Sequence, residues 1–187
     1  PLLHLALPMI RDRAAQRCYH AAAADAICAE LAAGRNVAFL TLGDPAVYST
    51  WGYLHSLVEA RGYTAKMIPG VPSFCAAAAA LGEPLCEAGQ PLHILPASYE
   101  GIGTMGDDST PSEAQRQPVT VLMTSGKSLP KVLAALREEG QLHSARLVER
   151  ARMSGQRIVK DLRGDETSSY FTILLVKPKE VKSLSIL

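Results

Sequence analysis

Long apolar runs are absent from this sequence of 187 residues, although apolar residues make up 48% of it. No run approaches the roughly 20 residues that a transmembrane helix needs, so we expect no membrane partner. An excess of charge of one sign is absent as well, since 19 basic and 18 acidic residues give a formal net charge of +1. Nucleic-acid-binding proteins carry clustered positive charge, and this balance therefore argues against a nucleic-acid partner.

Metal-ligating patterns are missing too. Cysteines occur only at Cys18, Cys28, Cys75 and Cys86, with no Cys-x-x-Cys spacing, and the five histidines share no ligand spacing. We therefore predict no metal site. The apolar or alanine-rich surroundings of the cysteines favour buried free thiols in a reducing compartment, which predicts a cytoplasmic protein.

The most informative stretch that is present runs from Asn36 to Thr50 and has the pattern of a strand, a turn and a helix. The nearly all-apolar run Val37–Leu42 predicts a strand buried on both faces. Gly-Asp-Pro at 43–45 ends it, and Ser49 or Thr50 can cap the helix that follows. The aspartate then lies at the carboxyl end of a buried strand, where ligands bind in open α/β sheets.

Similar units flank that stretch and predict a mostly parallel sheet. Asp12 can cap an alanine-rich helix, and a strand at 64–68 is followed by a Pro-Gly-Val-Pro turn and a helix that Ser73 can cap. Right-handed crossovers would place this turn and the Gly-Asp-Pro turn at one sheet edge. The expected strands are 2–7, 37–42, 64–68, 92–95, 119–124, 145–150, 157–162 and 170–177, and the expected helices end before Gly34, Gly62, Gly82 and Gly140.

Composition changes after Gly89, where we place a domain boundary. Residues 97–118 are rich in Gly, Ser, Asp, Thr and Pro without periodicity, which is typical of an active-site loop or a disordered one. The second half is strand-rich with one clear helix. We therefore predict an α/β protein of two α/β domains, residues 1–90 and 91–187, with further native sequence before Pro1.

Several motifs, in order along nearly the whole chain, resemble those of the tetrapyrrole methylases of cobalamin and sirohaem synthesis. They are Leu42-Gly43-Asp44-Pro45, Val47-Tyr48-Ser49-Thr50, Ile68-Pro69-Gly70-Val71-Pro72-Ser73-Phe74, Leu147-Val148-Glu149-Arg150-Ala151, Gly155-Gln156-Arg157-Ile158 and Tyr170-Phe171-Thr172. Within the family, the Val-Tyr-Ser-Thr segment and Gly155-Gln156-Arg157 are most similar to members that methylate C20 of precorrin-2.

The resemblance implies two α/β domains around a cofactor-binding trough, S-adenosylmethionine between them, a tetrapyrrole substrate and a homodimer. The residues that it implies for cofactor binding are Leu42, Gly43, Asp44, Val47, Pro72, Ser73, Met123, Ala151 and Thr172. The chain departs from the family in two places. The N-terminal Gly-x-Gly-Pro-Gly turn is absent, and Pro72 stands where a small hydroxyl residue is common, which puts a side-chain hydrogen bond there in question.

Methyl transfer from a sulfonium needs no enzymic nucleophile, which fits a sequence without a triad or a paired-carboxylate signature. No catalytic residue is assigned, and Asp44 and Tyr48 are candidates for positioning; Asp44 is alternatively a turn-stabilising aspartate. Ser49 and Thr50 are alternatively helix caps, and any one of the arginines a solvated surface charge. The substrate-binding candidates, hydroxyls and arginines suited to carboxylates, are Tyr48, Ser49, Thr50, Arg11, Arg13, Arg150 and Arg157.

Other functions remain open at this stage. The chain could methylate another ring position or take the cobalt complex of precorrin-2. It could instead be a non-catalytic sensor that binds a small anion in the same trough. A ribosomal-RNA methylase of the same superfamily is disfavoured by the near-neutral charge, because phosphate contacts need a basic surface.

Overall fold

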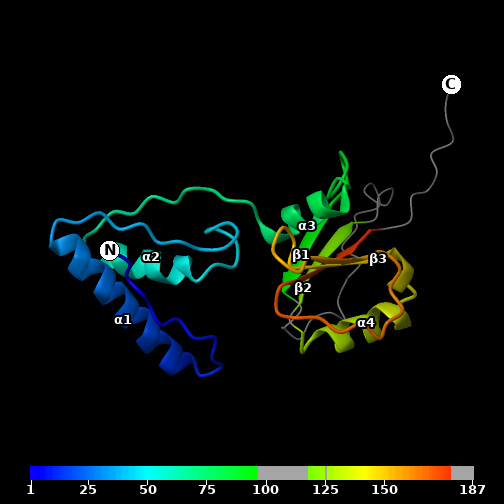
Figure 1. Ribbon diagram of the computed structural model, residues 1–187, viewed down its shortest axis with the longest axis horizontal. Helices are drawn as coiled ribbons and strands as arrows, with labels where there is room; N and C mark the ends of the chain where they lie inside the picture. Colours follow the sequence, from blue (N-terminus) through cyan, green and yellow to red (C-terminus); the bar gives the residue numbers. More distant parts are fainter. Residues whose placement is uncertain (97–117, 125, 178–187) are drawn as a thin grey trace. The chain divides into compact units, whose positions relative to one another are not determined.

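The computed structural model of the protein describes residues 1–96, 118–124 and 126–177. Its chain separates into two compact units, Pro1–Pro72 and Ser73–Leu187 (Figure 1). The expected loop at 97–118 lies, apart from its last residue, outside the described residues. The predicted domain limits, 1–90 and 91–187, stay a prediction. Among the described residues, no helix has both the length and the apolarity needed to cross a membrane.

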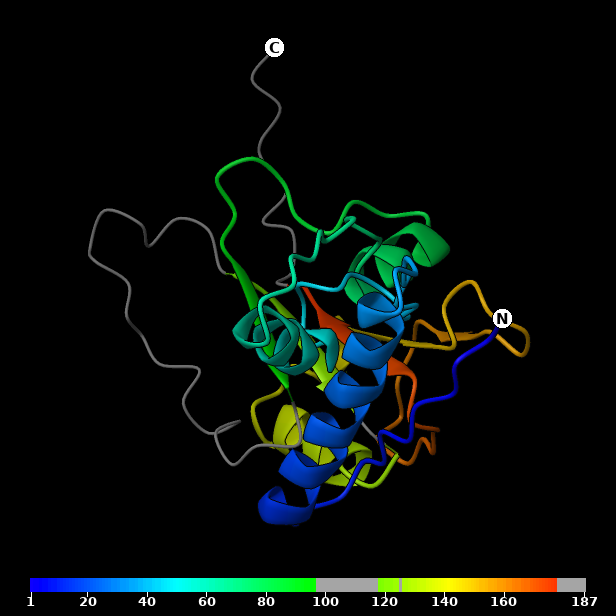
Figure 2. The same cartoon turned by 90° about the vertical axis from the view of Figure 1, so that its left-hand side faces the viewer.

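The first unit is built on two packed helices, α1 (Arg13–Ala32) and α2 (Trp51–Ala60). Helix α1, the long blue helix of Figure 2, begins where Asp12 Oδ1 accepts hydrogen bonds from the backbone N–H groups of Ala14 (2.8 Å) and Ala15 (3.1 Å). Its alanines allow α2 to approach closely. The buried side chains between the helices are Ala23, Ala24, Ile27, Trp51, Leu54 and Val58.

The three strands predicted in this unit, 2–7, 37–42 and 64–68, are not formed: the structure assigns no strand to residues 1–72. Some residues in or next to these segments are partly buried against the helices. They are Leu5, Leu7, Val37, Phe39, Tyr63 and Ala65. Burial of 37–42 on both faces is therefore also wrong, because Leu40 and Leu42 are 85% and 72% exposed while Val37 and Phe39 are half-buried. A strand also needs backbone hydrogen bonds to a neighbouring segment, and such pairing does not follow from a local pattern.

The second unit contains a five-stranded sheet with the order β1-β2-β5-β3-β4. Its strands are β1 (Leu92–Pro96), β2 (Val119–Thr124), β3 (Ala145–Glu149), β4 (Arg157–Val159) and β5 (Thr172–Val176). Strand β1 is parallel to β2 and the other neighbours are antiparallel, so the prediction of a mostly parallel sheet is wrong for the described residues. The α/β class and the five strands predicted after residue 90 are confirmed, with shorter ends for β3, β4 and β5.

Helices α3 (Ser73–Leu81) and α4 (Leu129–Glu138) and the short 3₁₀ helix η1 (Leu142–Ser144) complete this unit. Helix α3 packs against β3 and β5. Helix α4 buries its predicted apolar face, Leu129, Val132, Leu133 and Leu136. Burial of each of these four side chains contributes roughly 1.5–3 kcal/mol of hydrophobic stabilisation. The side chains that form this core are Leu122, Leu129, Val132, Leu133, Leu136, Leu147 and Leu174.

The register of the sheet gathers four polar residues at one end. Thr124 on β2 lies opposite Thr172 on β5, which lies opposite Glu149 on β3, and Glu149 lies opposite Arg157 on β4. We call these four residues the Thr172 end of the sheet. It is where the described C-terminal motifs converge.

Candidate functional site

In the first unit, the carboxylate of Asp44 joins the two turns that the sequence singles out. Its Oδ1 accepts a hydrogen bond from the N–H of Ala46 (2.8 Å), and its Oδ2 accepts one from the N–H of Gly70 (2.9 Å), 26 residues away. The N–H of Val47 donates to the Asp44 carbonyl (3.2 Å) and closes the first turn. The structure therefore brings Gly-Asp-Pro and Pro-Gly-Val-Pro together, as predicted, although no sheet does so.

Two glycines make this junction possible. Gly43 has φ of +80°, a conformation that favours glycine. A Cβ added to Gly70 would lie 2.2 Å from the carbonyl oxygen of Gly43, so the two backbones meet without a side chain between them. Both glycines of this junction are exposed, and Asp44 is half-buried beside them.

Of the three residues Tyr48, Ser49 and Thr50 after the Gly-Asp-Pro turn, only Ser49 has a structural role that the hydrogen bonds identify. The Ser49 hydroxyl accepts a hydrogen bond from the N–H of Trp51 (3.2 Å) and lies 3.3 Å from the Thr41 hydroxyl. Ser49 thus serves the start of α2, whereas Thr50 makes no side-chain capping bond there. Tyr48 is exposed and has φ of +50°. A substrate contact by any of these three side chains stays a prediction.

The remaining predicted cofactor residues of the N-terminal motifs flank the junction in sequence. Leu42 precedes it and is 72% exposed. Pro72 is the last residue of the first unit, and Ser73 begins α3 in the second. Arg11 and Arg13, predicted to meet substrate carboxylates, are exposed beside the Asp12 cap of α1.

In the second unit, buried hydroxyls link the strands at the Thr172 end of the sheet. Thr124 Oγ1 donates to the carbonyl of Thr172 (3.3 Å), and Thr172 Oγ1 donates to the carbonyl of Ser169 (2.9 Å). Met123, another predicted cofactor residue, is half-buried on β2 beside Thr124. Thr172 therefore fixes both a strand end and the segment that precedes it.

Ala151 lies in a tight turn after β3, between two residues with left-handed backbone. Arg150 has φ of +52° and Arg152 has φ of +62°, conformations that cost an ordinary residue about 1 kcal/mol each. The turn is held because the N–H of Arg150 donates to the carbonyl of Phe171 (2.8 Å), just before β5. The guanidinium of Arg150 lies over Gly155, where an added Cβ would be 3.1 Å from Nη1.

Glu149 and Arg157 form a partly enclosed ion pair at the same end. The Glu149 side chain is 13% exposed; its Oε2 accepts from Arg157 Nε (3.0 Å), and its Oε1 accepts from the N–H of Ser169 (2.6 Å). Burial raises the pKa of Glu149, but the hydrogen bonds from Ser169 and Arg157 outweigh it and hold the pKa below its usual value. Arg157 also donates to the carbonyl of Thr167, so two groups of the fold already engage its guanidinium, and its contact with substrate stays a prediction.

Sequence reasoning missed the roles of Gly70, Glu149 and Ser169. The role of Gly70 could have been suspected, because a glycine in a Pro-Gly-Val-Pro turn often serves a backbone conformation or a close approach. Glu149 has only its place in the Leu-Val-Glu-Arg motif as a signal, and Ser169 has no signal. Within the described parts of the chain, no group of three or more His, Cys, Asp or Glu side chains is placed to hold a metal ion.

Comparison with known proteins gives one family match. Residues 3–165 match the family described as tetrapyrrole (corrin/porphyrin) methylases. The chain is 36% identical over 159 residues to the cobalamin biosynthesis protein CobIJ of Mycobacterium tuberculosis, covering 84% of this chain and 30% of that protein. It is 32% identical over 159 residues to the precorrin-2 C(20)-methyltransferase of Sinorhizobium sp, covering 84% of this chain and 62% of that protein. The chain thus spans less than two thirds of the length of these relatives.

The alignment with a third relative covers a larger share of both chains. The probable cobalt-precorrin-2 C(20)-methyltransferase of Methanocaldococcus jannaschii is 28% identical over 177 residues, 92% of this chain and 71% of that protein.

Solved structures show the same fold. The methyltransferase CobJ superposes with a TM-score of 0.62 at 24% identity, covering 89% of this chain and 74% of that one. The uroporphyrin-III C-methyl transferase of Thermus thermophilus, complexed with S-adenyl homocysteine, gives a TM-score of 0.59 at 20% identity, covering 87% of this chain and 73% of that one.

Proposed function

Because the chain belongs to the tetrapyrrole (corrin/porphyrin) methylase family, we propose that it methylates C20 of precorrin-2 in cobalamin biosynthesis. The methyl donor is S-adenosylmethionine, and the products are precorrin-3A and S-adenosylhomocysteine. The observation that carries the proposal is the match to relatives named as C(20)-methyltransferases for precorrin-2 and cobalt-precorrin-2. The order of the Gly-Asp-Pro and Val-Tyr-Ser-Thr motifs supports the same ring position.

The residues present fit S-adenosylmethionine. Each Asp44 oxygen accepts one backbone hydrogen bond and keeps further acceptor capacity, so this carboxylate can stabilise the turn and still contact a ligand. Gly43 and Gly70, which approach each other beside it, are both exposed. The residues that would hold the cofactor are Leu42, Gly43, Asp44, Val47, Pro72, Ser73, Met123, Ala151 and Thr172.

The bound cofactor would supply an electrophilic methyl group on a sulfonium. The protein's part is to hold the attacking ring carbon in line with that methyl group and to exclude water, and a protein nucleophile is not required. Asp44 and Tyr48 are the proposed positioning residues. Errors of about 1 Å in this placement can lower a rate ~100-fold, so rigid turns matter more here than reactive side chains.

Binding of precorrin-2 requires cations for its carboxylates. Arg11, Arg13 and Arg150 are the proposed partners of those carboxylates. Arg157 is the weakest of the four predicted arginines, because Glu149 and Thr167 already engage its guanidinium.

We also propose that the protein is a homodimer, as the resemblance to the family implies, and that it is cytoplasmic. Its four cysteines are free thiols, which suits a reducing compartment. They are not buried as predicted, since Cys18 is exposed and Cys28, Cys75 and Cys86 are half-buried. Light scattering of the purified protein tests the dimer, and a mass of a single chain would refute it.

The experiment that tests the reaction uses methyl-labelled S-adenosylmethionine with precorrin-2 or its cobalt complex, and NMR locates the label. Label at C20 supports the proposal, whereas label at C11 or C17 refutes the ring position and leaves the family intact. Comparison of the two substrates decides the second candidate, the cobalt form of the step, which the name of the Methanocaldococcus relative favours. Cofactor binding in calorimetry without transfer to any tetrapyrrole would point instead to a sensor.

A further inference from the structure

Glu149, the last residue of β3, engages both of its carboxylate oxygens in polar contacts, although it belongs to no predicted cofactor or substrate set. Its two carboxylate oxygens serve different partners, the N–H of Ser169 at 2.6 Å and Arg157 Nε at 3.0 Å. With 13% of its side chain exposed, the carboxylate meets little competing water. Contacts of this kind to a charged acceptor are among the stronger hydrogen bonds in proteins.

These contacts hold the segment from Thr167 to Thr172 that leads into β5. Glu149 binds the Ser169 N–H directly, and it orients Arg157, which donates to the carbonyl of Thr167. A third contact comes from within the segment, where Thr172 Oγ1 donates to the Ser169 carbonyl. Two of these three hydrogen bonds to the segment therefore depend on the Glu149 carboxylate.

The segment has little room to shift. A Cβ added to Gly126 would lie 2.2 Å from the carbonyl oxygen of Ser168, so the backbones of these two residues are in close contact. At its other end, the carbonyl of Phe171 accepts from the N–H of Arg150 and thereby ties the segment to the turn that contains Ala151. Movement of the segment would displace both Thr172 and Ala151.

We propose that Glu149 is a positioning residue for cofactor binding. By holding Ser169 and Arg157, it fixes the Thr167–Thr172 segment and, through it, the two residues Ala151 and Thr172 that bind S-adenosylmethionine in the proposed function. The inference rests on that function for the identity of the ligand. Glu149 acts through its neighbours and does not touch the cofactor.

The substitution Glu149→Gln is a sharp test because both partners are donors. An amide has one acceptor oxygen and one NH₂ donor, so in either orientation it places a donor against Ser169 N–H or against Arg157 Nε. The volume of the side chain is kept, and no cavity forms. The variant Arg157→Lys gives a second route, since it keeps a positive charge but lacks the guanidinium fork that reaches both Glu149 and Thr167.

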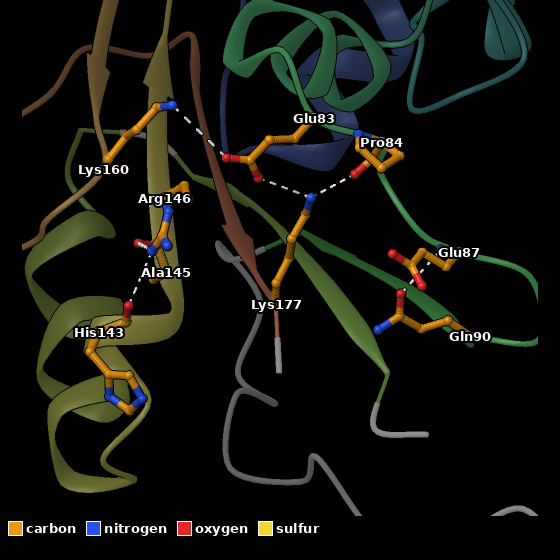
Figure 3. A network of polar contacts seen from close by, with 9 residues as sticks. All are labelled: Glu83, Pro84, Glu87, Gln90, His143, Ala145, Arg146, Lys160 and Lys177. Carbon is orange, nitrogen blue, oxygen red and sulfur yellow. Dashed lines mark hydrogen bonds and ion pairs between the residues drawn. The ribbon is translucent and has the colours of Figure 1, made fainter. Parts of the chain in front are cut away.

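Glu83 offers a matched control in the same unit. Its carboxylate accepts from Lys177 Nζ (3.1 Å) and lies 4.0 Å from Lys160 Nζ, and Lys177 Nζ also donates to the Pro84 carbonyl (Figure 3). Lys177 follows the last residue of β5, so this ion pair lies at the end of that strand opposite to Thr172. The change Glu83→Gln therefore removes an ion-paired carboxylate without reaching the Thr167–Thr172 segment.

Three measurements are made on the wild type, Glu149→Gln and Glu83→Gln. Calorimetry gives the Kd for S-adenosylmethionine, steady-state kinetics give the cofactor KM and kcat, and hydrogen exchange of the unliganded protein follows the Ser169 amide. We expect Glu149→Gln to raise Kd and KM about tenfold, the effect of losing one hydrogen bond to a charged group, with kcat within about twofold. Exchange at Ser169 should accelerate in Glu149→Gln and not in Glu83→Gln, whose Kd should change less than about twofold.

Wild-type affinity in Glu149→Gln, or an equal loss of affinity in Glu83→Gln, would overturn the proposal. If Glu149→Gln does not fold, Arg157→Lys replaces it, and unchanged Kd and Ser169 exchange in that variant would also overturn it. If the wild type fails to bind S-adenosylmethionine, the proposed function fails and the cofactor role of Glu149 fails with it. Ser169 exchange still decides, separately, whether Glu149 holds the segment.

Discussion

Replacement of Gly70 by alanine tests whether the junction of the two N-terminal turns is the centre of the cofactor site. Gly70 donates its N–H to Asp44 Oδ2 at 2.9 Å, and a Cβ built on it would lie 2.2 Å from the carbonyl oxygen of Gly43. Its backbone does not require glycine, because its φ is not positive. Only the space between the two turns forbids a side chain.

The magnitude follows from that distance. Real Cβ contacts are at least 3.0 Å, so the turns must separate by about 0.8 Å, and the clashing atom is backbone rather than a flexible side chain. Overpacking of this kind destabilises by about 1–3 kcal/mol, and loss of the bond to Asp44 would add about 1.5–3 kcal/mol. A shift of nearly 1 Å in groups that position the reactants can lower the rate ~100-fold.

The assay compares Gly70→Ala with Gly52→Ala. Gly52 lies within α2, and a Cβ there would meet no atom within 4 Å, so alanine should stabilise the helix by up to about 1 kcal/mol. Urea unfolding measures stability, and calorimetry and turnover measure cofactor binding and rate. If Gly70→Ala keeps wild-type stability and cofactor affinity, the junction is neither tight nor part of the site, and the reasoning is wrong.

Three further predictions address the Asp44 turn, the ion pair of Glu83 with Lys177 and the core position Leu133. Asp44→Asn should lose about 1.5–3 kcal/mol in urea unfolding, because both backbone partners are donors and an amide can accept from only one; unchanged stability would refute this. The hydrogen bond from Lys177 holds the pKa of Glu83 below 4.5, so its stabilisation is present above the unfolded pKa and is lost as pH falls through the folded pKa. Unfolding of Glu83→Gln should therefore depend less on acid pH than that of the wild type, and parallel profiles would contradict the assignment. Leu133→Ala, at a fully buried position, should lower the free energy of unfolding by 2–5 kcal/mol, roughly the range for such cavities, and a loss below about 1 kcal/mol would mean that α4 repacks.

Local signals in the sequence determined the helices and the core strands. Asp12 begins α1 by accepting hydrogen bonds from two backbone N–H groups, and left-handed Gly34 follows the helix end, as their residue types predict. The apolar run from Val119 to Thr124 forms a strand buried along almost its whole length. These features depend on neighbours in sequence, so a pattern of residue types suffices to predict them.

Pairing between distant segments was decided only by the tertiary structure. Val37–Leu42 has the composition of a buried strand, yet alternate residues of it pack on helices without a neighbouring strand. The turn at Asp44 was predictable from its residues, whereas the hydrogen-bond partner of the carboxylate, the Gly70 N–H 26 residues away, was not. The cofactor and substrate residues proposed from motifs remain predictions.

Arg157 and Glu149 illustrate the same dependence on tertiary structure at the Thr172 end of the sheet. An arginine in a family motif is a reasonable partner for a carboxylated substrate, but here its guanidinium meets Glu149, eight residues earlier in the chain, and the carbonyl of Thr167, ten residues later. Glu149 also binds Ser169, 20 residues away. Residue type determines which groups need a hydrogen-bond partner, and only the folded chain decides which partner comes within reach, because that depends on how separate strands and turns are packed.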